Sequence, residues 1–98
     1  MLAVASDQRI RWPDHEQRRV DAIARGLPNL AWERVSAGSG SKGERLYDWA
    51  LIRGWRENGW SHGLLVRRSI EEQPEHAYYW FYAPRRKATL ELLVRAAG

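Results

Sequence analysis

The sequence contains no cysteine, which excludes a disulfide framework and any zinc site built on thiolates. A chain without disulfides fits a reducing compartment, so we expect a cytoplasmic protein. No apolar run approaches the ~20 residues that cross a bilayer, and we therefore expect no membrane partner. The short apolar start, residues 1–6, has no basic segment before it and is not typical of a signal peptide.

Positive charge and tryptophan, by contrast, are abundant. The 98 residues carry 16 Lys and Arg against 12 Asp and Glu, and the formal charge of +4 suits a polyanionic partner such as DNA. Charge of this size also occurs in small proteins that bind no polyanion. The six tryptophans can each bury on the order of 150–250 Å², so the sequence predicts one small folded domain with a substantial core.

The first third of the chain predicts one strand and one helix. Residues 2–6 form a short apolar run, typical of a fully buried strand. Asp14 is a candidate helix N-cap, with Gln17 three residues later as in a capping box, and the spacing predicts a helix over residues 15–26. Its apolar face would consist of Val20, Ile23, Ala24 and Leu27, at positions i, i+3, i+4 and i+7.

The rest of the chain predicts an antiparallel meander followed by a helix. A short strand is expected at residues 31–35, and the glycine- and serine-rich residues 36–43 predict a loop. Three further strands are expected at residues 45–53, 63–70 and 77–82, with Asn58-Gly59 as a hairpin turn. A final helix capped by Thr89 has its own apolar face, which consists of Leu90, Leu93, Val94 and Ala97.

The loop at residues 36–43 resembles a phosphate-binding loop in composition but not in spacing. A Walker loop needs Gly-Lys followed by Ser or Thr, whose hydroxyl reaches magnesium, whereas Lys42 follows Ser41 and precedes Gly43. Two interpretations stay open. The segment is either a plain hairpin connection or a contact of backbone and Lys42 to a nucleic-acid phosphate.

Two basic clusters and one aromatic run have similar alternatives. Arg67 and Arg68 end an apolar strand, and residues 85–87 (Arg-Arg-Lys) follow a proline; both clusters are either solvated strand ends or phosphate contacts. In the aromatic run 78–82, alternation places Tyr78, Trp80 and Tyr82 on one face, where they either pack in the core or stack on unpaired bases. The three histidines, His15, His62 and His76, lack metal-ligand spacing, and the aspartates form no pair typical of a metal site. We expect no metal site.

Several unusual sequence segments follow one another in order. They are residues 31–34 (Ala-Trp-Glu-Arg), 36–43 (Ser-Ala-Gly-Ser-Gly-Ser-Lys-Gly), 45–50 (Arg-Leu-Tyr-Asp-Trp-Ala), 64–69 (Leu-Leu-Val-Arg-Arg-Ser), 77–79 (Ala-Tyr-Tyr), 83–84 (Ala-Pro), 90–94 (Leu-Glu-Leu-Leu-Val) and 97–98 (Ala-Gly). At compatible spacing, and over nearly the whole chain, these segments resemble bacterial insertion-sequence transposases of the DDE endonuclease superfamily. Glu44, where the family often has proline, and residues 80–82 depart from the family pattern.

The resemblance implies an α+β fold with a partial ribonuclease-H-like core. Residues 1–30 would hold a core strand and a helix, residues 31–84 a mostly antiparallel β insertion, and residues 88–98 the start of the C-terminal helix, all within a single fragment domain. The family uses three acidic residues to bind divalent metal, usually Mg²⁺, for attack on a DNA phosphodiester. None of the three carries over to this chain, because two lie upstream of the segment resembling residues 2–6 and Glu91 precedes the position of the third.

We therefore expect a truncated transposase fragment that is catalytically inactive alone, holds no cofactor and keeps weak contacts to DNA. The candidate DNA-binding residues are Lys42, Arg45, Arg67, Arg68, Arg85, Arg86 and Lys87. The alternatives are a standalone basic nucleic-acid-binding module, or a protein-interaction module that offers the strand at residues 2–6 to a partner or a second copy. Because a strand and a helix of a larger core would leave apolar faces uncovered, we expect marginal stability or self-association.

Overall fold

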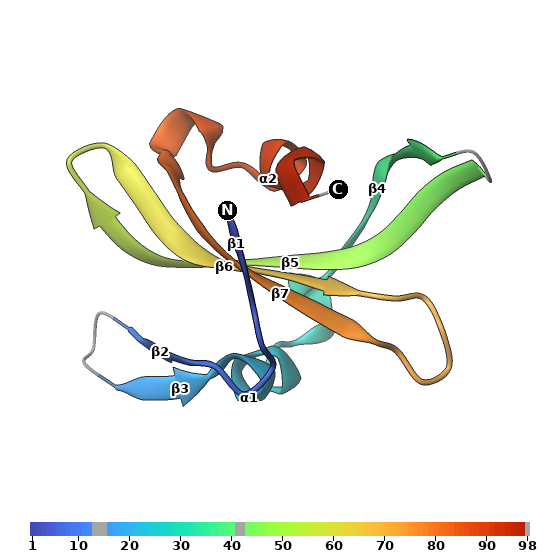
Figure 1. Ribbon diagram of the computed structural model, residues 1–98, viewed down its shortest axis with the longest axis horizontal. Helices are drawn as coiled ribbons and strands as arrows, with labels where there is room; N and C mark the ends of the chain where they lie inside the picture. Colours follow the sequence, from blue (N-terminus) through green and yellow to red (C-terminus); the bar gives the residue numbers. More distant parts are fainter. Residues whose placement is uncertain (13–15, 41–42, 98) are drawn as a thin grey trace.

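The computed structural model describes residues 1–12, 16–40 and 43–97, and at its centre lies a five-stranded antiparallel sheet. The strands lie in the order β1 (Leu2–Val4), β7 (His76–Pro84), β6 (Trp60–Arg68), β5 (Gly43–Glu57) and β4 (Glu33–Gly40) (Figure 1). Among the described residues, two α-helices, two short 3₁₀ helices and a small hairpin complete the fold. The expected α+β class with a mostly antiparallel sheet is confirmed, whereas a partial ribonuclease-H-like core is not.

The turn at Asn58-Gly59 sets the register of the central strands. Both residues have positive φ, 49° and 79°, as a two-residue type I′ hairpin turn requires. From this turn β5 and β6 pair, with a bulge near Gly54, until Asp48 lies opposite Arg68. β7 pairs along the other side of β6 over its whole length. Since side chains alternate along a strand, this register decides which residues of the three strands share a face.

One face of the sheet, the hairpin face, is covered by a small hairpin and a helix. These are β2 (Arg9–Arg11), β3 (Gln17–Arg19) and α1 (Val20–Arg25), drawn below the sheet in Figure 1 and followed by η1 (Asn29–Ala31). Trp12, directly after β2, packs closely against Gly54 of β5, where a Cβ would come within 2.6 Å of its ring. The buried core on this face consists of Trp12, Val20, Ala24, Leu64, Val66 and Tyr78.

The opposite face, the helix face, is covered by α2 (Leu90–Ala97), which follows the 3₁₀ turn η2 (Arg85–Lys87). Thr89 caps α2 as predicted, since its carbonyl oxygen accepts from the Leu93 amide and its hydroxyl from the Leu92 amide. Arg53 Nη1 donates to the Ala88 carbonyl oxygen at 2.7 Å and so links β5 to the start of the helix. The buried core here consists of Trp49, Leu65, Phe81, Ala88, Leu93 and Val94.

The predicted helix over residues 15–26 is wrong in its first half. Residues 17–19 form β3, which pairs with β2, and the helix begins only at Val20. Ile10, at the centre of β2, packs against the hairpin-face core, so tertiary packing outweighs the local helix signal. The predicted apolar face of the helix is confirmed, because Val20 and Ala24 are buried and Ile23 packs beside them.

The sequence predicted a loop over the glycine- and serine-rich residues 36–43, but most of this segment belongs to strands. β4 continues to Gly40 and β5 begins at Gly43, with Ser39 opposite Glu44 beyond an irregularity in the ladder. Backbone pairing requires no side chain, which is why a composition without packing residues can still form a ladder. Residues 41–42 lie outside the described residues, as does the predicted helix cap Asp14.

The N-terminal strand is shorter and more exposed than predicted. β1 covers Leu2–Val4 at the edge of the sheet, and Leu2 is 66% exposed, whereas a fully buried strand was expected over residues 2–6. β1 pairs with β7, so residues 1–30 and 31–84 contribute to one sheet. The chain's own elements bury a core on each face of this sheet, so the expected uncovered core faces are at least partly covered.

Gly63 provides a test of packing on the helix face. It lies opposite Phe81, and a Cβ there would collide with the Ile52 carbonyl oxygen and lie 2.8 Å from two ring carbons of Phe81. We expect Gly63→Ala to lower the free energy of unfolding by about 1–3 kcal/mol, measured from urea midpoints. The matched control is Gly26→Ala, whose φ of −82° and nearest contact of 3.6 Å accept a methyl group within about 0.5 kcal/mol. Equal midpoints for Gly63→Ala and the parent chain would contradict this packing.

Candidate nucleic-acid interface

The predicted DNA-binding residues do not form one patch. Arg67 and Arg68 end β6, whereas η2, with Arg85, Arg86 and Lys87, adjoins the beginning of β6, where the Arg85 amide donates to the Gly59 carbonyl oxygen at 2.8 Å. With nine residues in β6 at about 3.3 Å each, the two groups lie roughly 25 Å apart. The two other predicted residues are Lys42, which lies outside the described residues, and Arg45, which is placed in β5 by its backbone.

Arg67 and Arg68 lie on opposite faces of the sheet and are each held by their own surroundings. The Arg67 guanidinium lies over the Tyr47 ring on the helix face, 4.7 Å from its centroid. Arg68 lies 4.1 Å from the centroid of Trp32 on the hairpin face, and its Nη2 donates to Asp48 Oδ2 at 3.2 Å. Arg68 is therefore already paired with an acid, which reduces its value as a phosphate contact.

Asp48 joins three strands by binding two arginines. Its second oxygen accepts from Arg34 Nε of β4 at 3.1 Å, while β6 provides Arg68. Burial alone would raise the pKa of Asp48, but hydrogen bonds from Arg34 and Arg68, together with their charges, lower it from its ordinary value of 3.8. Nearby, burial and the charge of Arg68 lower the pKa of His76, so this histidine adds no positive charge at neutral pH.

The basic triplet of η2 has a different environment. Arg85, Arg86 and Lys87 are all exposed, and none of them forms an ion pair within the part of the chain that the structure describes. The triplet lies beside the Asn58-Gly59 turn, at what we call the turn end of the sheet (Figure 1, upper left). Three adjacent exposed cations are available to an anionic partner there.

The opposite end of the sheet, the loop end, carries acids. The connection between β6 and β7 contains three exposed glutamates, Glu71, Glu72 and Glu75. These exposed acids thus lie at the loop end, together with the arginines held by Asp48 and Tyr47, whereas the exposed basic triplet lies at the turn end.

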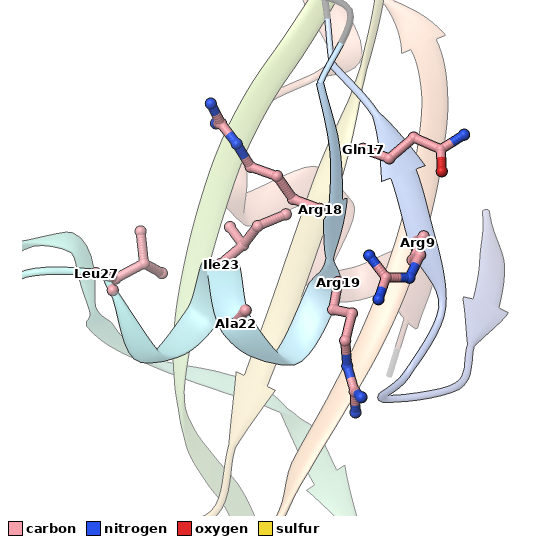
Figure 2. A pocket seen from close by; sticks show the side chains of 8 residues that line it. Arg9, Gln17, Arg18, Arg19, Ala22, Ile23 and Leu27 are labelled. Carbon is pink, nitrogen blue, oxygen red and sulfur yellow. The ribbon is translucent and has the colours of Figure 1, made fainter.

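Sequence reasoning missed a second basic surface, which the β2–β3 hairpin creates. Figure 2 shows arginine side chains that project from this hairpin, with α1 beside it. Together with α1 they line a hollow of about 480 Å³. The hollow is lined by Arg9, Gln17, Arg18, Arg19, Ala22, Ile23, Gly26 and Leu27. Three-residue strands are too short to show a period of two, so this hairpin left no clear signal in the sequence.

The arginines of the hairpin are only partly available. Arg19 makes two hydrogen bonds to Asp21, at 3.1 and 2.8 Å; these bonds and the neighbouring charge lower the pKa of Asp21 and raise that of Arg19. Arg18 pairs with Glu16 at 2.8 Å. Arg9 has no acidic partner among the described residues, and it lines a second hollow of about 400 Å³ on the other side of β2, together with Arg11 and Trp80.

The aromatic run in β7 divides between core and surface. The face predicted to hold Tyr78, Trp80 and Tyr82 is confirmed as the hairpin face. Tyr78 is buried beside α1, Trp80 is half-buried, and Tyr82 is 54% exposed at the turn end. The stripe is thus core at one end and surface at the other, because α1 and the small hairpin cover only part of the face.

Asp48 allows a test of the network at the loop end. Because its pKa is lowered in the folded state, its stabilising effect is fully present above about pH 5 and fades as pH falls through and below 3.8. We expect Asp48→Asn to cost roughly 1 kcal/mol at pH 7 and progressively less below pH 4, measured by urea unfolding across that range. Glu72→Gln, which removes an exposed carboxylate at the same end, is the control and should show no such gap. A cost for Asp48→Asn that does not change with pH would count against the network.

Within the described residues, no helix is long and apolar enough to cross a membrane. Nor does any group of three or more His, Asp or Glu side chains there lie close enough to hold a metal ion. Comparison of the chain with known protein families, with characterised proteins and with solved structures found no match.

Proposed function

We propose that this chain binds DNA through its turn end and is a non-catalytic relative of insertion-sequence transposases of the DDE superfamily. The relationship is supported by the ordered sequence segments that resemble that family. Binding is supported by one structural observation above all. The turn end presents three adjacent exposed cations without ion pairs among the described residues, while exposed glutamates lie at the opposite end.

Contacts of this kind favour the sugar-phosphate backbone rather than particular bases. Arg and Lys side chains bind phosphate oxygens and release counterions from the nucleic acid, so the affinity depends on salt. If all three residues of the triplet contact phosphates, the logarithm of the binding constant should fall with a slope of about −2 to −3 against the logarithm of salt concentration. This is a weak, sequence-tolerant mode of binding that needs no metal ion.

Charge reversal at Arg86 provides the first test. We expect Arg86→Glu to weaken binding of a 20-base-pair duplex about three- to tenfold at low salt and to reduce the salt slope by about one, as measured by fluorescence anisotropy. Arg95→Glu, in the last turn of α2, changes the net charge equally and is the matched control. Equal losses in the two variants would show that only net charge matters, and absence of binding by the parent chain at low salt would remove the proposed function.

The proposed relationship also concerns chemistry. In the family, phosphodiester cleavage requires three acids that hold divalent ions, and none of them carries over to a residue of this chain. We therefore expect the purified chain to leave supercoiled plasmid DNA intact in Mg²⁺ or Mn²⁺, scored as conversion to nicked circles. Cleavage that EDTA abolishes, and that persists through further purification, would overturn this part of the proposal.

A further inference from the structure

The hairpin face carries a row of aromatic rings that runs from the core to the turn end. Trp12 packs edge-on against Trp80, with ring centroids 6.5 Å apart, and His62 lies between Trp80 and Tyr82 at 6.4 and 4.2 Å. The row ends with Trp60, whose ring stacks on Tyr82 at 4.6 Å with an angle of 19° between the planes. The register produces this row, because β6 and β7 place alternate side chains on the same face.

The rings at the turn end of the row are far more exposed than the ring at its inner end. Trp12 is 6% exposed, whereas Tyr82 is 54% and Trp60 38% exposed. The two outer rings are held in a near-parallel stack by neighbouring strands, so they form a rigid aromatic surface at the edge of the core. Such a surface can accept a flat apolar group without reorganisation of the protein.

The charges beside the row indicate what that flat group is. Basic side chains lie near both ends of the row: η2 begins beside the turn at which the row ends, and Arg9 lines the 400 Å³ hollow whose wall includes Trp80. Cations that flank exposed aromatic rings match a nucleic-acid strand, whose bases present π-faces and whose backbone carries regularly spaced phosphates. An apolar peptide would leave these cations without partners. Bases in a duplex are already stacked on one another, so the match is to unpaired nucleotides.

We propose that Trp60 and Tyr82 form a stacking platform for unpaired bases, with the flanking basic residues as contacts for the phosphates of the same strand. This inference rests on the proposed DNA binding at the turn end and assigns to it a substrate class, single-stranded or locally unpaired DNA. The platform tolerates any base, because stacking requires a π-face and no hydrogen-bonding edge.

The test compares three fluorescent ligands of matched charge. They are a 12-nucleotide thymidine oligonucleotide, a 12-unit abasic backbone with the same phosphates, and a duplex with the same number of phosphates. We expect the parent chain to bind the oligonucleotide at least about fivefold more tightly than the abasic backbone and more tightly than the duplex. Tyr82→Ala and Trp60→Ala should each remove most of this preference while leaving the affinity for the abasic backbone unchanged.

Two variants control for a purely structural role of the rings. Tyr82→Phe keeps the ring and should keep the preference, and Leu46→Ala removes an exposed apolar side chain from the other end of β5 and should also keep it. Thermal melting is followed for every variant, so that a fall in stability without a change in preference identifies rings that serve only to stabilise the hairpin and overturns the platform.

The outcomes separate this inference from the proposed function. Equal, salt-sensitive binding of the oligonucleotide and the abasic backbone would overturn the platform and leave backbone binding intact. Loss of binding to all three ligands in the parent chain would overturn both. A preference for the oligonucleotide that disappears in Tyr82→Ala, and persists in Tyr82→Phe, would establish stacking at this site.

Discussion

A two-residue turn with positive φ at both positions fixes the register of β5 and β6, and most other features of the sheet depend on it. If β6 slipped by one residue, Leu65 would leave the core beneath α2 and enter the face covered by α1, and the reverse would hold for Leu64 and Val66. Both faces bury bulky side chains, so such a slip would lower the stability of the cores on both faces. The register that begins at the Asn58-Gly59 turn is therefore supported on both faces of the sheet. Trp12 packs on the hairpin face, and α2 packs on the helix face.

The elements that the sequence predicted well are those in which a long periodic pattern and a local signal agree. The strands of the meander combine alternating side chains with an Asn-Gly turn, and α2 combines a four-residue apolar face with a threonine cap. The β2–β3 hairpin was not predicted, because it has neither a long pattern nor a clear local signal. Each strand has only three residues, and Gln17 and its neighbours match a helix start equally well. There the burial of Ile10 and Trp12 decides the structure, and burial is not visible in a local window.

The residues of the candidate site also fall into those that the sequence could indicate and those that it could not. The sequence alone indicated the basic residues 85–87, and the structure places all three at the surface. Composition could not show that Arg68 is bound to Asp48, because the pair depends on a cross-strand register that spans 20 positions in sequence. The Arg9 surface was missed for the reason that the hairpin was missed. Charge can thus be counted from a sequence, but its availability depends on which opposite charge the fold places beside it.

The exposed ring pair at the turn end has a stabilising role as well as the binding role inferred for it. Cross-strand aromatic pairs contribute to hairpin stability, and Trp60 and Tyr82 lie where the small hairpin and α1 no longer cover the sheet. The two roles are compatible, because a stack that is already formed in the free protein loses little conformational entropy when a third ring is added to it. Stability of the turn end and readiness to bind therefore have one cause, the parallel stacking of two rings on adjacent strands. A partner that lacks flat groups would gain nothing from that stack, whereas one with unpaired bases and a charged backbone would contact the rings and the flanking cations together.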